Sequence, residues 1–391
     1  MTRVATSLAE GSTEQVGETL VADLRIGLAD QAPALVMAFA SPVHPLAGVL
    51  SGLHAAFPGA LVIGATTAGE FTEKGDAKQA VAAVALAGPY RAFAGMGRGL
   101  RASPERAVEE AVSGLPRSVV GYPHRTAILL LDPMAGNGEE TTLLTASMLG
   151  DDVRLVGGAA GDDLHMMAPE VGLGGAAAAD AAVVAVLFSR APLGIGVCHD
   201  HQPISAPHKV TRAEANLVIE IDGRPAWDVW VEATREHAAA RGLDVTKMAD
   251  DEIGAFLLLF EAGLSVGREY KIRAPLSREG TAIRFATALP EGTVLRITES
   301  TPERQIASAR EAARRACAQL RNRPAGAVVF DCICRNLILK DRFRGAVAEM
   351  SEELGGAPLA GFETYGEIAL DTGNLSGFHN TTSVVLAFPE E

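Results

Sequence analysis

Two loops of this sequence share the pattern G-x-x-T-x-G-E, which sets a hydroxyl and a carboxylate between glycines. The loops are residues 64–70, with Thr67 and Glu70, and residues 361–367, with Glu363, Thr364, Tyr365 and Glu367. Glycine permits sharp turns and close backbone approach. An acidic side chain beside such a turn caps a helix or accepts an N–H from an amine, guanidinium or ring ligand. The pattern therefore predicts either strand-end turns or a ligand pocket.

A second group of candidates lies near the C-terminus. Cys332 and Cys334 precede Arg335 at the end of an apolar run. The arginine could depress a thiol pKa, bind a ligand carboxylate through two hydrogen bonds, or serve as a cap. His379 and Asn380 begin a polar run of four residues, which suits either a buried pocket or a surface turn.

Several motifs of known catalytic machinery are missing from the sequence. It has no G-x-x-x-x-G-K-[ST], H-E-x-x-H or C-x-x-C. His199 and His201 have the residue types of a metal site, but a polar strand end accounts for them more simply. We therefore expect a protein that is not an enzyme. A cysteine-dependent enzyme using Cys332 or Cys334 is the catalytic alternative.

Composition and charge narrow the class of protein. The chain has 391 residues, of which 48% are hydrophobic and 21% charged, and its formal net charge is −14. This composition excludes a disordered chain, and the missing basic block argues against a nucleic-acid partner. No apolar run reaches the ~18 residues of a membrane span, and the N-terminus lacks a signal sequence. We expect a cytoplasmic protein with reduced cysteines and no membrane partner.

The elements that must position these residues form a weak internal repeat. A short apolar run, a helical stretch, a second apolar run, a glycine-bracketed loop and a third apolar run follow one another three times. The middle copy shortens its loop to residues 158–161 and sets Asp162 in the place of the glutamate. Near-continuous Val, Ala, Leu and Ile are typical of strands buried on both faces. The repeat predicts an α/β fold built from related strand-helix-strand-loop-strand units.

The material between the second and third copies is different. Residues 216–221, 270–273, 281–286 and 294–298 alternate as antiparallel strands, and residues 225–238 and 250–260 have helical patterns. A long helix is expected to start after Ser300. These features predict an N-terminal extension over 1–30, an α/β domain over 31–224 and a second α/β domain, with some antiparallel strands, over 225–391.

The glycine-bracketed loop at 64–70 and its companions resemble those of the FIST family, a sensory module of prokaryotic signal transduction. Residues 155–163, 210–230 and 290–298, together with DCICR, PLAGFETYGEIA and FHNTT near the C-terminus, follow the family pattern in the same order. The resemblance covers most of the chain. It implies a FIST N part up to about residue 224 and a FIST C part beyond it.

This resemblance implies a small-ligand sensor that acts in trans on a kinase or cyclase, such as a histidine kinase, and it leaves a homo-oligomer open. Stand-alone members of the family include haem-binding nitric oxide sensors, so haem is the expected cofactor. The axial candidates near the expected pocket are His379, Cys332, Cys334 and Tyr365. The alternative is an amino-acid ligand without haem, with Arg335 on its carboxylate and Glu367 or Glu363 on its ammonium.

Overall fold

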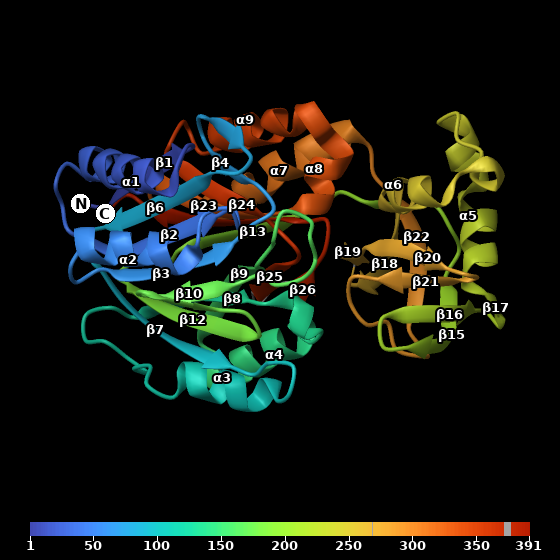
Figure 1. Ribbon diagram of the computed structural model, residues 1–391, viewed down its shortest axis with the longest axis horizontal. Coiled ribbons are helices and arrows are strands. Elements are labelled where there is room, and N and C mark those ends of the chain that lie inside the picture. Colours follow the sequence, from blue (N-terminus) through green and yellow to red (C-terminus); the bar gives the residue numbers. More distant parts are fainter. Residues whose placement is uncertain (268, 371–376) are drawn as a thin grey trace.

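The computed structural model describes residues 1–267, 269–370 and 377–391, which form a larger and a smaller lobe (Figure 1). Among these residues the larger lobe contains three mixed sheets of six strands, and the smaller lobe contains one sheet of nine strands. Every strand pair of the nine-stranded sheet is antiparallel. The structure confirms the mixed α/β class expected from the sequence, including the antiparallel strands of the C-terminal half.

The larger lobe consists of three copies of one unit. The first copy contains β1 (Arg3–Ala9), α1 (Thr13–Leu28), β2 (Pro33–Ala40), α2 (Leu46–Ala56), β3 (Leu61–Thr66), β4 (Glu70–Thr72), β5 (Gly75–Ala77) and β6 (Val81–Ala87). The second contains β7 (Tyr90–Arg98), α3 (Pro104–Val112), β8 (His124–Leu131), α4 (Gly138–Leu149), β9 (Val153–Ala159), β10 (Val171–Leu173), β11 (Ala176–Ala178) and β12 (Ala181–Ser189). The third contains β13 (Gly194–Cys198), α7 (Pro302–Cys317), β23 (Pro324–Cys332), α8 (Ile333–Leu339), α9 (Phe343–Glu353), β24 (Leu359–Thr364), β25 (Glu367–Leu370), β26 (Gly377–His379) and β27 (Ser383–Pro389).

The short hairpin of each unit joins the sheet of another unit. Strand β4 pairs with β24 of the third unit, β10 pairs with β3 of the first, and β25 pairs with β9 of the second. The three exchanges close a ring, so no unit can complete its sheet alone. The glycine-bracketed loops are the segments that cross from one sheet to the next.

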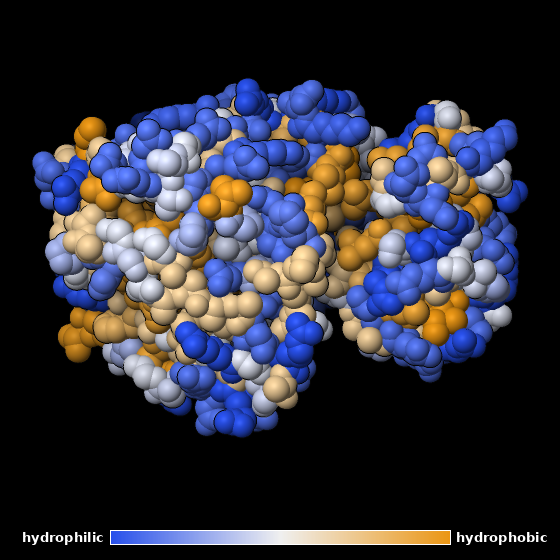
Figure 2. Space-filling view, in the orientation of Figure 1, coloured by the Kyte–Doolittle hydropathy of each residue, from blue (hydrophilic) through white to orange (hydrophobic). Residues whose placement is uncertain are grey.

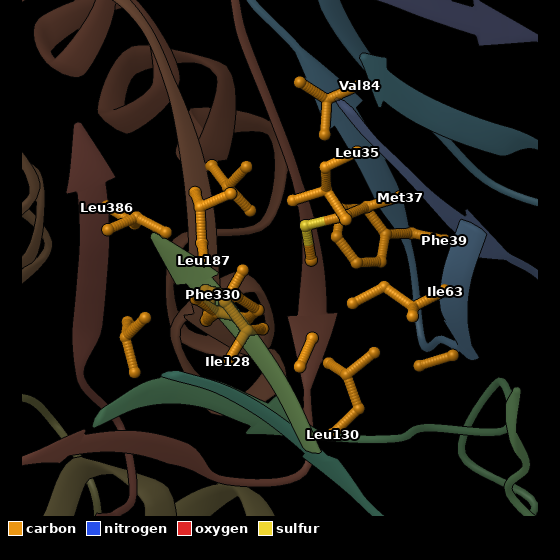
Figure 3. Packing of buried hydrophobic residues seen from close by; sticks show 14 of the residues in the cluster. Leu35, Met37, Phe39, Ile63, Val84, Ile128, Leu130, Leu187, Phe330 and Leu386 are labelled. Atoms are coloured by element: carbon orange, nitrogen blue, oxygen red, sulfur yellow. The ribbon is translucent and has the colours of Figure 1, made fainter. Parts of the chain in front are cut away.

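The three sheets share one apolar core between them. Strands of all three units contribute to it, and Figure 3 shows Phe39, Ile128 and Phe330 among its side chains. The rings of Phe39 and Phe362 stack with centroids 4.5 Å apart, although they come from different units. Burial of this apolar surface stabilises the assembly by about 25 cal/mol per Å². The inner core therefore holds the three sheets together.

Helices cover the outer face of each sheet. Helix α1 illustrates how the sequence produces this layer: Ser12 forms a capping box with Gln15, and residues at helical spacing face the sheet. The residues of α1 that face the sheet are Val16, Leu20, Leu24 and Leu28, all fully buried. Similar outer clusters pack α3 on the second sheet and α7 with α9 on the third.

The smaller lobe is inserted into the third unit, after its first strand. It contains β14 (Gln202–Pro203), β15 (His208–Glu214), β16 (Leu217–Ile221), β17 (Arg224–Pro225), α5 (Ala226–Ala240), α6 (Ile253–Leu259), β18 (Phe260–Val266), β19 (Glu269–Arg273), β20 (Pro275–Glu279), β21 (Ala282–Phe285) and β22 (Val294–Glu299). Trp230 and Phe285 pack edge to face in its separate core. The chain then returns to the larger lobe through α7.

The lobes follow different boundaries from those expected for the domains. Residues 3–9 form β1, which pairs along its whole length with β6, so the first 30 residues belong to the first unit. The expected division at residue 224 falls at the hairpin between β16 and β17, inside the smaller lobe. The return of the chain to the larger lobe from α7 onward has no local sequence signal.

No helix of the described residues has the length and apolarity needed to cross a membrane.

Candidate functional site

The first and third glycine-bracketed loops have the same internal hydrogen bonds. In each loop the threonine hydroxyl donates to the glutamate, and the other carboxylate oxygen accepts a backbone N–H. The bonds are Thr67 to Glu70, Thr364 to Glu367, Ala80 N–H to Glu70 at 3.2 Å and Thr382 N–H to Glu367 at 3.2 Å. Both glutamates are buried. These carboxylates are engaged inside the fold, where they fix the crossing segments.

Burial changes the ionisation of these loop carboxylates. Desolvation raises the pKa of Glu70 to about 8 against the hydrogen bonds from Thr67 and Ala80. Desolvation also raises the pKa values of Glu363 and Glu367 well above the ordinary range. The folded chain therefore holds protons on buried carboxyls near neutral pH that the unfolded chain has lost.

Glu70 alone should lower the free energy of unfolding by about 2 kcal/mol between about pH 6.5 and about pH 8.5. Glu70 is ionised throughout this range in the unfolded chain but releases its proton near pH 8 when folded. Raising the pH therefore stabilises the unfolded state relative to the folded state. His199 and His379 oppose this trend only at its lower end, because burial keeps them neutral when folded while their unfolded imidazoles lose protons near the ordinary pKa of 6.5. Urea unfolding at several pH values measures the slope. A Glu70→Met variant with the wild-type slope would contradict the assignment.

The middle loop differs from its expected form. Strand register places Glu70 opposite Phe362, Glu367 opposite Gly158, and Val171 opposite Ala65. Val171 therefore holds the position of the glutamates, and Asp162 does not. The middle loop, residues 160–170 between β9 and β10, is longer than its counterparts instead of shorter. The repeat in the sequence places Asp162 before the structurally equivalent position, which is Val171.

Asp162 and Tyr365 organise this longer loop together. The Tyr365 hydroxyl donates to the Asp162 carboxylate at 2.6 Å and accepts the Leu164 N–H at 2.8 Å. The same carboxylate accepts the backbone N–H groups of Met166, Met167 and Ala168 at 2.7–3.0 Å. Burial opposes its ionisation, but the tyrosine and backbone donors lower the pKa of Asp162 overall. Both side chains are occupied by this local network.

Glu363 lies where the third and first units meet. Its backbone N–H donates to Gly69 at 2.8 Å, and its carboxylate accepts from Asn336. The second carboxylate oxygen is buried without a hydrogen-bond partner. Desolvation, with repulsion from Asp331 and Glu70, raises the pKa of this carboxyl. Because the carboxyl stays protonated, burying it costs much less than burying a charged carboxylate.

Arg335 is fully buried and saturated by the protein. Its guanidinium donates to Asp331 at 2.7 Å, to Ser308 at 2.8 Å, and to the side chain and carbonyl of Gln305. Cys334 lies in α8 and does not share a strand with Cys332. Both cysteines are buried, and desolvation raises the pKa of Cys332 well above its ordinary value. Neither the thiol of Cys332 nor Arg335 is presented to a ligand.

His379 and Asn380 lie at the junction of the lobes. His379 is fully buried, and neither ring nitrogen has a hydrogen-bond partner. Desolvation and the nearby Lys271 and Arg273 lower the pKa of this imidazole. The Asn380 side chain accepts the Ala274 N–H of the smaller lobe at 3.3 Å. This polar run therefore joins the two lobes.

The cleft between the lobes offers the open site that the loops do not. Figure 2 shows that the surface is hollowed where the two lobes meet. The cleft measures about 700 Å³. It is lined by residues 136–140, Leu143, Leu144 and Ser147 from the larger lobe and by Leu264, Arg273, residues 287–290 and Thr293 from the smaller lobe. A space of this size suits a small organic ligand.

Several buried polar atoms lining the cleft lack protein partners. They are the side-chain oxygens of Asn137 and Thr287 and the Nε atom of Arg273. Such atoms are rare in native folds and favour a site that a ligand completes. None of the three stands out in the sequence. The alternation of Lys271 and Arg273 on β19 was an available signal, because residues two apart on a strand share a face.

The haem candidates do not meet in this cleft. His379, Cys332, Cys334 and Tyr365 are all buried, and none is among the lining residues. Histidines 199 and 201 do not belong to a cluster of three or more His, Cys, Asp or Glu residues suited to a metal within the described ranges. His199 instead donates to the Tyr270 carbonyl at 2.6 Å and accepts the His201 N–H at 3.0 Å. The four haem candidates are packed inside the fold, so a haem could reach them only if the surrounding elements moved apart.

Comparison with known proteins places this architecture in a family. The chain is 25% identical over 193 residues to an uncharacterized protein, Mb0898c, of Mycobacterium bovis, a match covering 49% of each chain. It is 24% identical over 195 residues to an uncharacterized protein, MT0656, of Mycobacterium tuberculosis, covering 48% of each. The matched part is thus about half the length of these relatives. A FIST N domain matches residues 34–224 and a FIST C domain residues 228–370, so the chain belongs to the FIST family of sensory domains.

Proposed function

We propose that this FIST chain senses a small ligand bound in the cleft between its lobes and passes the signal to a signalling protein such as a histidine kinase or cyclase. The family supplies the sensory role. The observation that carries the location is Arg273, which is 4% exposed, lines the cleft and keeps an unpartnered Nε. A ligand held by both lobes can favour one arrangement of them over another, which is the requirement for a signal.

The cleft suits an amino acid or similar metabolite better than the pocket expected around Arg335 and Glu367. Arg335 is saturated, and Glu367 is engaged with Thr364 and Thr382. The cleft instead provides Arg273 for a carboxylate and Glu139 or Glu140 for an ammonium, with Leu143 as part of an apolar wall. This arrangement favours the haem-free alternative.

A saturating cleft ligand should raise the free energy of unfolding by about 2.7 kcal/mol at a hundred times its Kd. Thermal-shift screening of amino acids and related metabolites, followed by calorimetry, measures the effect. Ala288 is exposed and lines the cleft, so Ala288→Trp should fill the space and abolish stabilisation. Ala240→Trp, on the exposed side of α5 and away from the cleft, is the matched control. Equal stabilisation of both variants would overturn the cleft as the site.

A haem-based nitric oxide sensor is the second candidate, and one observation favours it: the buried imidazole of His379 has both nitrogens unpartnered. Haem binding at this residue requires a rearrangement that opens the packed junction. The visible spectrum after haem addition tests this. A sharp Soret band that shifts with nitric oxide and is lost in His379→Ala would support the haem sensor, and a broad, non-stoichiometric spectrum would discard it.

The proposal does not include catalysis. A cysteine-dependent enzyme needs an accessible thiolate, whereas Cys332 is buried and its thiol pKa is raised by desolvation. Rapid labelling of Cys332 by a thiol reagent at neutral pH in the folded protein would revive the catalytic alternative.

A further inference from the structure

We propose that the cleft takes a small organic anion, whose charged group binds Lys271 and Arg273 in place of the Glu139 carboxylate. The inference rests on the proposed function and specifies the chemical class of the ligand. The anionic group of the ligand would replace the carboxylate of Glu139, and this exchange would change the contacts between the lobes.

One carboxylate joins the lobes at the cleft. Glu139 on α4 of the larger lobe accepts from Lys271 at 3.0 Å and from Arg273 at 2.6 Å, both on β19 of the smaller lobe. The side chains of Lys271 and Arg273 are 13% and 5% exposed, while that of Glu139 is 34% exposed. The anion is therefore the partly solvated member of the group and the one that a ligand can reach.

The charges of this group do not balance. Buried Arg273 and partly buried Lys271 share one carboxylate, and across the described ranges no second acidic side chain pairs with either of them. Burial, with repulsion from Arg273, lowers the pKa of Lys271 against the attraction of Glu139. An excess positive charge in a buried site is costly unless an anion compensates it. Arg273 is the one cation among the described residues that line the cleft, beside Glu139 and Glu140, so the positive charge is confined to Arg273 and the neighbouring Lys271.

Further donors at the same place remain free for an anion. Arg273 keeps its Nε without a partner. The amino terminus of α4 faces the cleft through residues 137–140, and Asn137 gives it no side-chain cap because its amide donates to the Leu100 carbonyl at 2.8 Å. Helix amino termini favour anions. The guanidinium of Arg273, with its unpartnered Nε, lines the same cleft.

The remaining walls define the body of the ligand. Apolar side chains from both lobes line the cleft around the charged group, namely Leu143, Leu144, Leu264, Leu289 and Pro290. Leu143 is 50% exposed in this conformation, so a ligand can bury further apolar surface there. The combination selects a molecule with an anionic head and a short apolar body.

Displacement of Glu139 would also alter the contact between lobes. The bond from Arg273 to the Phe378 carbonyl at 2.9 Å and the bond from Thr381 to Glu261 at 2.6 Å do not involve Glu139 and would keep the lobes joined. The ligand would thus exchange an ion pair between lobes for its own contacts to the smaller lobe. This exchange supplies the difference between bound and free states that a sensor requires.

Calorimetric titration with hexanoate and its neutral counterpart hexanamide tests the inference. Hexanoate should bind at least about tenfold more tightly, the effect of one charge-assisted hydrogen bond. Lys271→Met should lower hexanoate affinity about tenfold, and Lys271→Arg should restore most of it. Glu139→Gln should raise the affinity, because the competing carboxylate is gone. Glu109→Gln removes the same charge from an exposed position on α3 that does not line the cleft, and it should change the affinity less than about twofold.

The outcomes separate this inference from the proposed function. Equal binding of hexanoate and hexanamide, with both lost in Ala288→Trp, would overturn the anion assignment and leave the cleft sensor standing. Failure of hexanoate to bind either wild type or Glu139→Gln would also overturn the anion assignment, while the metabolite screen still decides the sensor. A melting temperature near that of wild type in Lys271→Met shows that a lost affinity does not reflect unfolding.

Discussion

Replacing Arg335 by methionine should lower the free energy of unfolding by about 3–5 kcal/mol and leave the affinity of a cleft ligand unchanged. The substitution removes the ion-pair partner of Asp331, and both side chains are fully buried. An uncompensated buried carboxylate costs this much because the interior cannot solvate it. Desolvation already raises the pKa of Asp331, so the variant should regain stability as the pH falls and this carboxyl takes up its proton.

Two controls separate the buried pair from a general loss of arginine. Arg314→Met removes an exposed arginine paired with Glu311, and exposed pairs contribute at most about 1 kcal/mol. The double variant Arg335→Met with Asp331→Leu should recover much of the loss, since an apolar pair carries no uncompensated charge. Chemical denaturation measures all three. A single Arg335→Met variant as stable as wild type, with weaker ligand binding, would return Arg335 to the ligand site.

Replacing Gly157 by alanine should destabilise the larger lobe by about 3 kcal/mol, the upper end for overpacking. The added Cβ would lie far inside van der Waals contact with the Leu129 carbonyl of the parallel neighbour β8. Gly64 and Gly361 make the same approach to Ala38 and Val329, so the three positions are equivalent in the three units. Backbone atoms cannot yield as a flexible side chain would, and the strand pair must separate.

Gly52→Ala is the opposite control. Gly52 lies within α2, and no neighbouring atom lies within 4 Å of the place that an added methyl group would take. Alanine there should stabilise the chain by about 0.5–1 kcal/mol through helix propensity. Thermal unfolding compares the two variants. A Gly157→Ala variant that unfolds at the wild-type temperature would show that β8 and β9 tolerate wider spacing.

The residue types of the glycine-bracketed loops did not reveal whether the loops bind a ligand. The loops were found from Thr67, Glu70, Thr364 and Glu367, but whether their carboxylates face a ligand depends on the backbone groups that meet them. Those groups come from residues ten or more positions away. Residue types at a turn therefore identify a junction without saying whether it is open or filled.

The linear order of residues determined the repeated unit. Apolar runs of strand length, helical stripes such as that of α1, and glycines at the strand ends are local patterns, and they correctly indicated an α/β chain of related units. The FIST resemblance rested on the same local segments, and it is confirmed over residues 34–224 and 228–370. Local physics is enough for these features because each depends on neighbours within a few residues.

Only the tertiary structure decided how the units combine. Exchange of hairpins among three sheets, return of the chain after the inserted lobe, and pairing of Glu139 with Lys271 and Arg273 all join residues more than a hundred positions apart or different units. Hydrophobic patterning specifies that a face is buried, and it does not specify which surface buries it. The cleft exists only where two such surfaces meet, so its residues carry no shared motif along the chain.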